Sequence, residues 1–262
     1  MEINVPEPRD VFAAIADVQA EFGGDRRTIG EWRELYRQEL ATALQGSPLL
    51  IFFWFVNNLL ERATAAESLQ RRLKGFQEHF VSFEAITAEP VSEVLDDASY
   101  RFPVAGLKVV MEAKRIVTTP GFTWARYVEQ AERFYETDFP KDEFLAIQGV
   151  GFKTRDLAVS ELSDRFAAMD LHVVRVTART GLLVHGYGNP EISTDVSTDS
   201  GYLFFHGLIL RLAKRTGWPG SGYSPGEIDR MLWNFGRAVC KARPDCQACP
   251  LAGTCLTSRA VA

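Results

Sequence analysis

The amino-acid sequence predicts an all-α protein of about ten helices. Apolar residues recur at intervals of three and four along most of the chain, whereas the alternation of apolar and polar residues that marks a half-buried strand is hard to find. With 262 residues, of which 46% are hydrophobic, the chain can build one large domain or two small ones around a real core. We expect domain boundaries near residues 45 and 168.

The N-terminal part of the chain shows two amphipathic helical patterns. The first of them stops at Gly23-Gly24, because glycines are common where a helix ends. The apolar positions are Val11, Phe12, Ile15 and Val18 in the first pattern, and Trp32, Leu35, Tyr36 and Leu40 in the second.

A third helix is expected to begin at Ser47-Pro48, since serine caps a helix N-terminus and proline fits its first turn. It runs through the longest apolar stretch, residues 49–56, which is eight residues long. A membrane-spanning helix needs about 20 apolar residues, so this stretch predicts a central helix buried on nearly all sides and excludes a transmembrane segment. Further helices are expected over residues 69–80, 104–117, 124–134, 171–182, 202–215 and 225–239.

Charge is distributed unevenly along the chain. The net charge is −5, which argues against indiscriminate binding to nucleic acids. The residues from His206 onward carry +5, however, and the remainder carries −10, so the C-terminal fifth can face a polyanion or form an ordinary solvated helical face. The N-terminus lacks a basic segment followed by an apolar stretch, which predicts a cytoplasmic protein.

A tight turn, Gly149-Val150-Gly151, is expected between two helical segments within residues 143–159. Glycines allow positive φ and close approach of the backbone to a bulky group, and the N–H groups that open the second helix suit a phosphate. Many such turns are purely structural. Lys153 lies in the first turn of the second helix, an unusual place for a merely structural lysine.

A carboxylate follows 17 residues after Lys153. Asp170 is placed to cap the next helix, and an ordinary N-cap is the simplest explanation for it. His172 is expected to pack or to form hydrogen bonds rather than to act as a catalyst.

All four cysteines lie near the C-terminus, in the pattern C-x5-C-x2-C-x5-C: Cys240, Cys246, Cys249 and Cys255. Without a secretory signal, a metal site is favoured over disulfides. Structural zinc usually pairs two short C-x2-4-C knuckles, whereas one C-x2-C flanked by two five-residue loops favours a [4Fe–4S] cluster over zinc.

Taken together and in this order, the hairpin with Lys153, the segment that begins at Asp170 and the cysteine pattern preceded by Phe235-Gly236-Arg237 resemble the endonuclease III family of helix-hairpin-helix DNA glycosylases. The resemblance is clear over residues 144–255 and weaker upstream. It implies a six-helix barrel domain at residues 46–168, with the helix-hairpin-helix at 141–166. It also implies an iron–sulfur domain at 169–262, joined by N-terminal helices at 1–45.

The resemblance implies a bifunctional repair enzyme, a DNA N-glycosylase with AP lyase activity toward oxidised pyrimidines of the thymine glycol type. Lys153 would attack C1′ of a flipped nucleotide and form a Schiff base that β-eliminates the 3′ phosphate, and Asp170 would assist. The cluster would be structural, and the protein would act as a monomer on double-stranded DNA, away from membranes, at the nucleoid if the source is bacterial. DNA contacts are expected at Gln148, Gly149, Val150, Gly151, Asn57, Asn58, Lys241 and Arg243.

Three features depart from the family pattern. The first cysteine loop is one residue shorter than usual, Asn57-Asn58 replaces the glutamine that fills the space left by the flipped base, and 94 residues separate Asn58 from Lys153. A glycosylase with another lesion preference, such as alkylated purines, and a weakly catalytic protein that binds damaged DNA are therefore the alternatives. The mismatch-specific adenine glycosylases are disfavoured because they lack the catalytic lysine.

Overall fold

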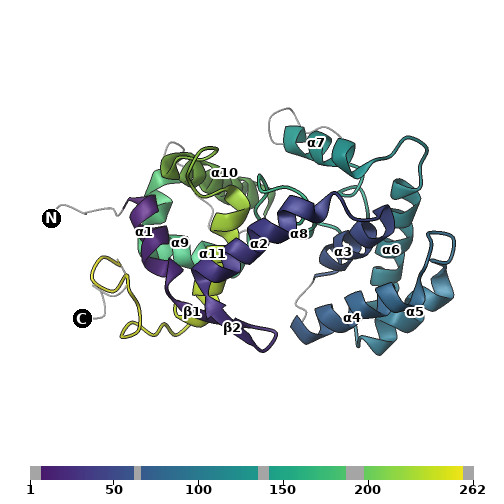
Figure 1. The fold of residues 1–262 in the computed structure, drawn as a ribbon, viewed down its shortest axis with the longest axis horizontal. Helices are drawn as coiled ribbons and strands as arrows, with labels where there is room; N and C mark the ends of the chain where they lie inside the picture. The colour runs from purple at the N-terminus through teal and green to yellow at the C-terminus, as the bar shows by residue number, and fades with distance from the viewer. Residues whose placement is uncertain (1–6, 62–65, 135–141, 187–197, 256–262) are drawn as a thin grey trace. The chain divides into compact units, whose positions relative to one another are not determined.

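A computed structural model describes residues 7–61, 66–134, 142–186 and 198–255 (Figure 1). Within these ranges the chain forms eleven α-helices, one short 3-10 helix and one two-stranded hairpin, which confirms the all-α prediction. The chain divides into two compact units, Leu40–Phe166 and the combination of Met1–Glu39 with Ala167–Ala262. The first boundary between these units falls inside a continuous helix, α2 (Ile29–Ala43). None of the described helices is long and apolar enough to cross a membrane.

The unit Leu40–Phe166 contains six helices that share one apolar core. They are α3 (Pro48–Leu59), α4 (Ala66–His79), α5 (Ala88–Asp97), α6 (Pro103–Val117), α7 (Trp124–Phe134) and α8 (Phe152–Ser160). Helix α3 packs against α4, α6 and α8, and is therefore central within its unit (Figure 1). As predicted, the Ser47 side chain caps α3 by accepting a hydrogen bond from the Leu50 N–H.

The apolar face of α3 is narrower than its sequence predicts. Phe55 packs its ring 4.7 Å from that of Phe144, and Phe52 and Phe53 are also buried. Leu50 and Trp54, in contrast, are 45% and 48% exposed, so the prediction of a helix buried on nearly all sides is wrong. Helix α5 was not predicted, although Val91, Val94 and Leu95 bury one of its faces.

The other unit contains a β-hairpin that the sequence analysis also missed. Strands β1 (Gln19–Phe22) and β2 (Asp25–Thr28) pair antiparallel, and the first helix, α1 (Pro8–Ala16), ends before them. Gly23 and Gly24 form the two-residue turn with φ of +60° and +84°. Positive φ at both turn positions is the geometry that joins twisted strands, so these glycines close a hairpin rather than end a helix.

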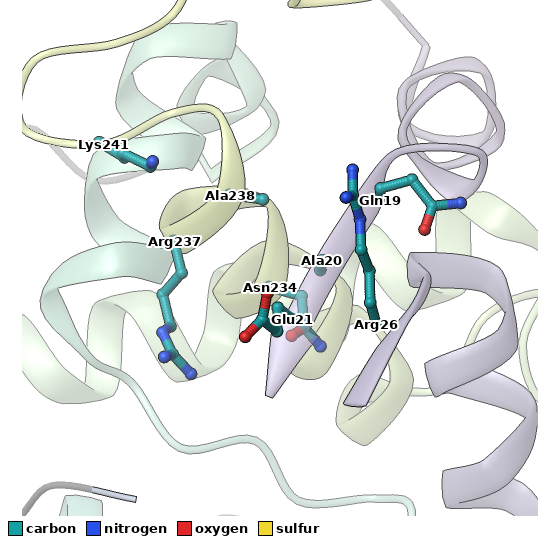
Figure 2. A pocket seen from close by; sticks show the side chains of 8 residues that line it. All are labelled: Gln19, Ala20, Glu21, Arg26, Asn234, Arg237, Ala238 and Lys241. Atoms are coloured by element: carbon teal, nitrogen blue, oxygen red, sulfur yellow. The ribbon is translucent and has the colours of Figure 1, made fainter. Parts of the chain in front are cut away.

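The hairpin packs against α11 (Pro225–Ala238), and a pocket of about 340 Å³ lies beside them. In Figure 2 the head groups of two lining arginines, Arg26 and Arg237, point in opposite directions. Arg237 lies over the ring of Trp233, at 4.4 Å from its centroid. This arginine therefore contributes to the packing of the pocket wall.

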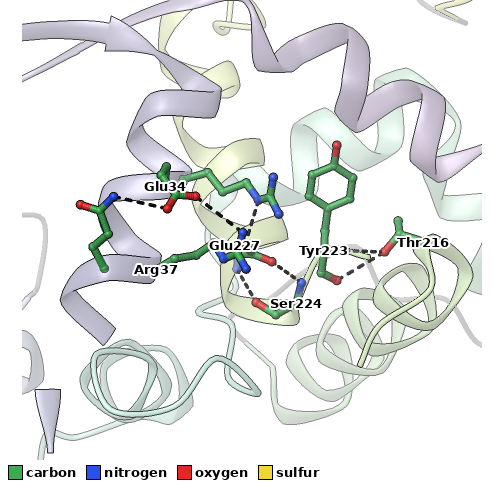
Figure 3. A network of polar contacts seen from close by, with 8 residues as sticks. Glu34, Arg37, Thr216, Tyr223, Ser224 and Glu227 are labelled. Carbon is green, nitrogen blue, oxygen red and sulfur yellow. Dashed lines mark hydrogen bonds and ion pairs between the residues drawn. The ribbon is translucent and has the colours of Figure 1, made fainter. Parts of the chain in front are cut away.

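The same unit also contains α9 (Leu171–Thr180), a 3-10 helix (Leu182–Gly186) and α10 (Asp199–Thr216). A polar network joins α2 to α11 (Figure 3). Buried Glu227 accepts hydrogen bonds from Arg33 Nε at 2.8 Å and from the Ser224 N–H at 2.6 Å, and Arg37 lies 3.4 Å from it. Because Glu227 also helps to cap α11, one carboxylate both starts that helix and fixes it to α2.

Candidate functional site

The glycine turn connects a series of tight turns to α8. Gly149 has a φ of +100°, whereas Gly151 has a φ of −117° and is the N-cap of α8. Positive φ is therefore required only at Gly149. A Cβ atom at Gly151 would have no heavy atom within 4 Å, so its backbone faces open space, as does the exposed side chain of Gln148. The regular helix expected before the turn is replaced by turns over residues 143–149, and residue 141 lies outside the described residues.

A buried charged cluster holds the turn segment and α8 together. The Asp142 side chain accepts hydrogen bonds from the N–H groups of Phe144 and Leu145, and its carboxylate lies 3.7 Å from Arg155 of α8. Arg155 is fully buried and lies 3.1 Å from Asp156. Tyr127 donates to Asp142, and burial together with that carboxylate raises the Tyr127 pKa well above its usual value. The cluster thus fixes the backbone on both sides of Gly149 and Gly151.

Lys153 lies in the first turn of α8, on the part of the helix that reaches solvent. Its side chain is 36% exposed, whereas Arg155, two residues later, is completely buried. Lys153 Nζ lies 3.6 Å from Oε1 of Glu61, which follows α3 and has a side chain 20% exposed. The structure therefore pairs the predicted nucleophile with a carboxylate that the sequence analysis did not identify.

Asn57 and Asn58 have different surroundings. Asn57 is 5% exposed, and its Oδ1 and backbone carbonyl accept hydrogen bonds from Arg72 at 2.7 and 2.8 Å. Arg72 is fully buried, lies over the Tyr100 ring, and has its pKa lowered to about 10 by burial. Asn57 thus joins α3 to α4 within the protein, which argues against its expected contact with DNA. Asn58 is partly exposed, and its Nδ2 donates to the Trp54 carbonyl.

Asp170 caps α9, as predicted. Its Oδ1 accepts hydrogen bonds from the N–H groups of His172 and Val173, at 2.8 and 3.0 Å. His172 lies 2.8 Å from Arg175 and packs against Gly236 of α11, where a Cβ atom would come within 2.9 Å of the His172 Cβ. His172 is therefore a packing and hydrogen-bonding residue. Asp170 and Lys153 belong to different units.

Two arginines of α9 hold the cysteine segment, residues 240–255. Arg175 donates to the carbonyls of Cys240 and Gly236 at 2.8 and 3.0 Å. Arg179 donates to the carbonyls of Lys241 and Ala242 at 2.5 and 3.1 Å. Lys241 and Arg243, which were expected to contact DNA, are exposed at the start of this segment. The helix that begins at Asp170 is therefore the helix that fixes the position of the cysteine segment.

The four thiols influence one another. Burial raises the pKa of the Cys249 thiol, and the other three cysteines raise it further. Burial also raises the pKa of the Cys240 thiol, against the lowering effect of Arg179. Among the described residues, no three metal-binding side chains are close enough to hold a metal ion as they stand. A set of four thiols in one short segment suits a cationic metal centre, since such a centre supplies the charge that deprotonates them.

Glu61, which pairs with Lys153, and Arg72, which binds Asn57, are among the residues that the sequence analysis missed. Glu61 lies 92 positions before Lys153, and no spacing rule joins residues so far apart. The paired polar residues Asn57-Asn58 at the end of an apolar run were the only signal in the sequence that pointed to this region.

No protein-family model matches the chain, and no curated protein sequence matches it. Solved structures do match. A DNA-bound covalent intermediate of endonuclease III has a TM-score of 0.55 and 19% identity over 90% of this chain and 99% of that one. A thermostable thymine-DNA glycosylase has a TM-score of 0.54 and 16% identity over 88% and 98%.

A third match is the 8-oxoguanine glycosylase/lyase of Methanocaldococcus jannaschii bound to DNA, with a TM-score of 0.54 and 18% identity over 78% of this chain and 88% of that one. All three matched proteins are DNA glycosylases. The described helices of the chain therefore have the fold of the helix-hairpin-helix DNA glycosylases.

Proposed function

We propose that the protein is a DNA N-glycosylase with AP lyase activity that removes oxidised pyrimidines from double-stranded DNA. The observation that carries the proposal is the position of Lys153. In a chain with the fold of DNA glycosylases, this lysine opens the helix after the glycine turn and keeps its amine partly exposed. An amine so placed can reach a sugar while the turn beside it binds the backbone of the same strand.

The reaction would begin with a damaged nucleotide flipped out of the duplex. The Lys153 lone pair would form a bond to C1′ as the glycosidic bond breaks. The electron pair of the glycosidic bond leaves with the base. The sugar ring would then open: the C1′–O4′ bond breaks, O4′ takes up a proton, and the adduct becomes a Schiff base. The Schiff base makes the proton at C2′ acidic, and loss of that proton expels the 3′ phosphate. Asp170 would stabilise the positive charge that develops on the sugar and assist the attack of the lysine.

The DNA backbone would contact the turn at Gly149, Val150 and Gly151. The open space at Gly151 supports this proposal, because a phosphate can approach its backbone without meeting a side chain. Gln148 would contact the same strand. Asn58 is the candidate for the space left by the flipped base, while exposed Lys241 and Arg243 would bind phosphates further along the duplex.

The cysteine segment would bind a [4Fe–4S] cluster through Cys240, Cys246, Cys249 and Cys255. The number of thiols and their mutual effect on ionisation support this assignment, with zinc as the alternative. The bound cluster would supply a structural crosslink and no chemical step. Arg175 and Arg179 would keep its loop attached to α9.

The experiment is incubation of the anaerobically purified protein with labelled duplexes that contain thymine glycol, uracil, an abasic site, 8-oxoguanine or an alkylated purine, with and without borohydride. Cleavage and trapping at thymine glycol are expected. Trapping confined to the abasic site would retain the lysine chemistry and contradict the oxidised-pyrimidine assignment. Tight binding without any trapping would favour a protein that only binds damaged DNA.

A further inference from the structure

Glu61 contacts Lys153 Nζ, the nitrogen that acts as the nucleophile in the proposed reaction. Its Oε1 lies 3.6 Å from Lys153 Nζ, and both residues belong to the unit Leu40–Phe166. At this separation the contact is an ion pair rather than a short hydrogen bond. Active-site contacts are often this long in the absence of a ligand and shorten when substrate binds.

The position of Glu61 is fixed by the end of α3. Its N–H donates to the Asn58 carbonyl at 3.0 Å, and the neighbouring Asn57 is tied to buried Arg72 through both its side chain and its backbone. The Glu61 charge also opposes the effect of burial on the Arg72 pKa, which shows that the two groups interact electrostatically. Glu61 therefore lies near two cations, Lys153 and Arg72.

DNA bound at the glycine turn, as proposed above, would exclude water from the pair. Solvent now reaches 36% of the Lys153 side chain and 20% of the Glu61 side chain, so both charges are partly hydrated. Exclusion of water raises the free energy of the charged Lys153 ammonium and Glu61 carboxylate, because both lose their hydration. Transfer of one proton converts them into two neutral groups. A lysine with a carboxylate in contact thus has a local acceptor for the proton that it must lose.

We infer that Glu61 orients the Lys153 amine and accepts a proton from its ammonium group before the amine attacks the sugar; this rests on the lyase function proposed above. The proton moves from Nζ to the Glu61 carboxylate, which leaves a neutral amine and a carboxylic acid. At an abasic site the amine lone pair then forms the bond to the C1′ aldehyde carbon. The carbonyl oxygen takes up one proton from the amine nitrogen and one from the Glu61 carboxylic acid and leaves as water. The products are the protonated imine and the Glu61 carboxylate.

The test compares three variants in single-turnover borohydride trapping on a duplex with an abasic site, with the dissociation constant measured for each. Glu61→Gln keeps the size of the side chain and removes its charge, and it should slow trapping by on the order of 10²-fold while the dissociation constant stays within about twofold. Glu61→Asp keeps the carboxylate and should recover part of the rate. Glu78→Gln is the matched control, because Glu78 and Lys74 form an exposed ion pair at the same 3.6 Å, and it should trap like the unaltered protein.

Each outcome separates this inference from the proposed function. If Glu61→Gln traps at the unaltered rate while Lys153→Ala fails to trap, the role of Glu61 is overturned and the lyase function stands. If the unaltered protein does not trap, both are overturned. If Glu61→Gln fails to fold, as judged by circular dichroism, Glu61→Asp decides: a rate below that of the unaltered protein at equal affinity supports the role, and an equal rate overturns it.

Discussion

The glycine turn and the cysteine segment are held in position by different interactions. A charged cluster, fully buried Arg155 and Asp156 with the nearly buried side chain of Asp142, fixes the turn from inside its unit. Hydrogen bonds from Arg175 and Arg179 to backbone carbonyls hold the start of the cysteine segment, most of which is exposed. The protein interior alone thus shapes the turn, whereas the cysteine segment depends on surface contacts and on whatever its thiols bind.

Removal of Arg155 should have the largest effect on stability. Arg155→Ala leaves Asp142 and Asp156 buried without their cation, and we expect a loss of about 3–5 kcal/mol in the free energy of unfolding. Guanidinium unfolding followed by tryptophan fluorescence measures it. Arg165→Ala is the control, because Arg165 is exposed at 3.2 Å from Glu132 and should contribute about 0–1 kcal/mol. Equal losses in the two variants would contradict the role of the buried cluster.

A substitution at Gly236 tests the contact between α9 and α11. A Cβ atom there would lie 2.9 Å from the His172 Cβ. The His172 Cβ is bonded directly to the backbone of α9, so no side-chain rotation can move it away. Gly236→Ala should therefore cost about 1–3 kcal/mol, measured by thermal unfolding. Gly253→Ala, where the added Cβ meets nothing within 4 Å, should leave the melting temperature almost unchanged. An unchanged melting temperature in Gly236→Ala would mean that the helices are not so closely packed.

Loss of Arg179 tests how the cysteine segment is held in position. Arg179→Ala removes the hydrogen bonds to the Lys241 and Ala242 carbonyls, each worth about 1 kcal/mol, and should affect the cysteine segment and not the rest of the protein. We expect faster proteolytic cleavage within residues 240–255 and a lower iron content, with little change in global unfolding. A global loss as large as that of Arg155→Ala would remove the distinction between the two regions.

The smallest effect is expected at the N-terminus of α3. Ser47→Ala removes the side-chain cap of the Leu50 N–H and should cost about 1 kcal/mol. Ser47→Asp, which restores an acceptor, should recover most of that loss in the same unfolding experiment. A full loss in both variants would show that the serine acts through another contact.

Regular features of the fold were predictable from the sequence because they depend on local patterns. The start of α3 at Ser47-Pro48 and the cap of α9 at Asp170 follow from one or two residues. The β-hairpin was missed because Gly23-Gly24 can either end a helix or join two strands, and the packing of β1 against α11 decides between them.

The surroundings of the candidate site were predictable only in part. The glycine turn and the place of Lys153 in the first turn of α8 agree with what the local sequence indicates. The pairing with Glu61 depends on the packing of α3 against α8, and the burial of Asn57 depends on Arg72 of the next helix. Both contacts depend on how one helix packs against another, so a single sequence without its fold does not reveal them.

The most direct test of the account is to identify the residue that becomes attached to DNA. The protein is trapped with borohydride on an abasic duplex, digested, and analysed by mass spectrometry alongside Lys153→Ala. The account predicts the sugar adduct on Lys153 and a loss of trapping and strand scission on the order of 10³-fold or more in the variant, with DNA binding largely retained. An adduct on another lysine, or unchanged scission by Lys153→Ala, would contradict it.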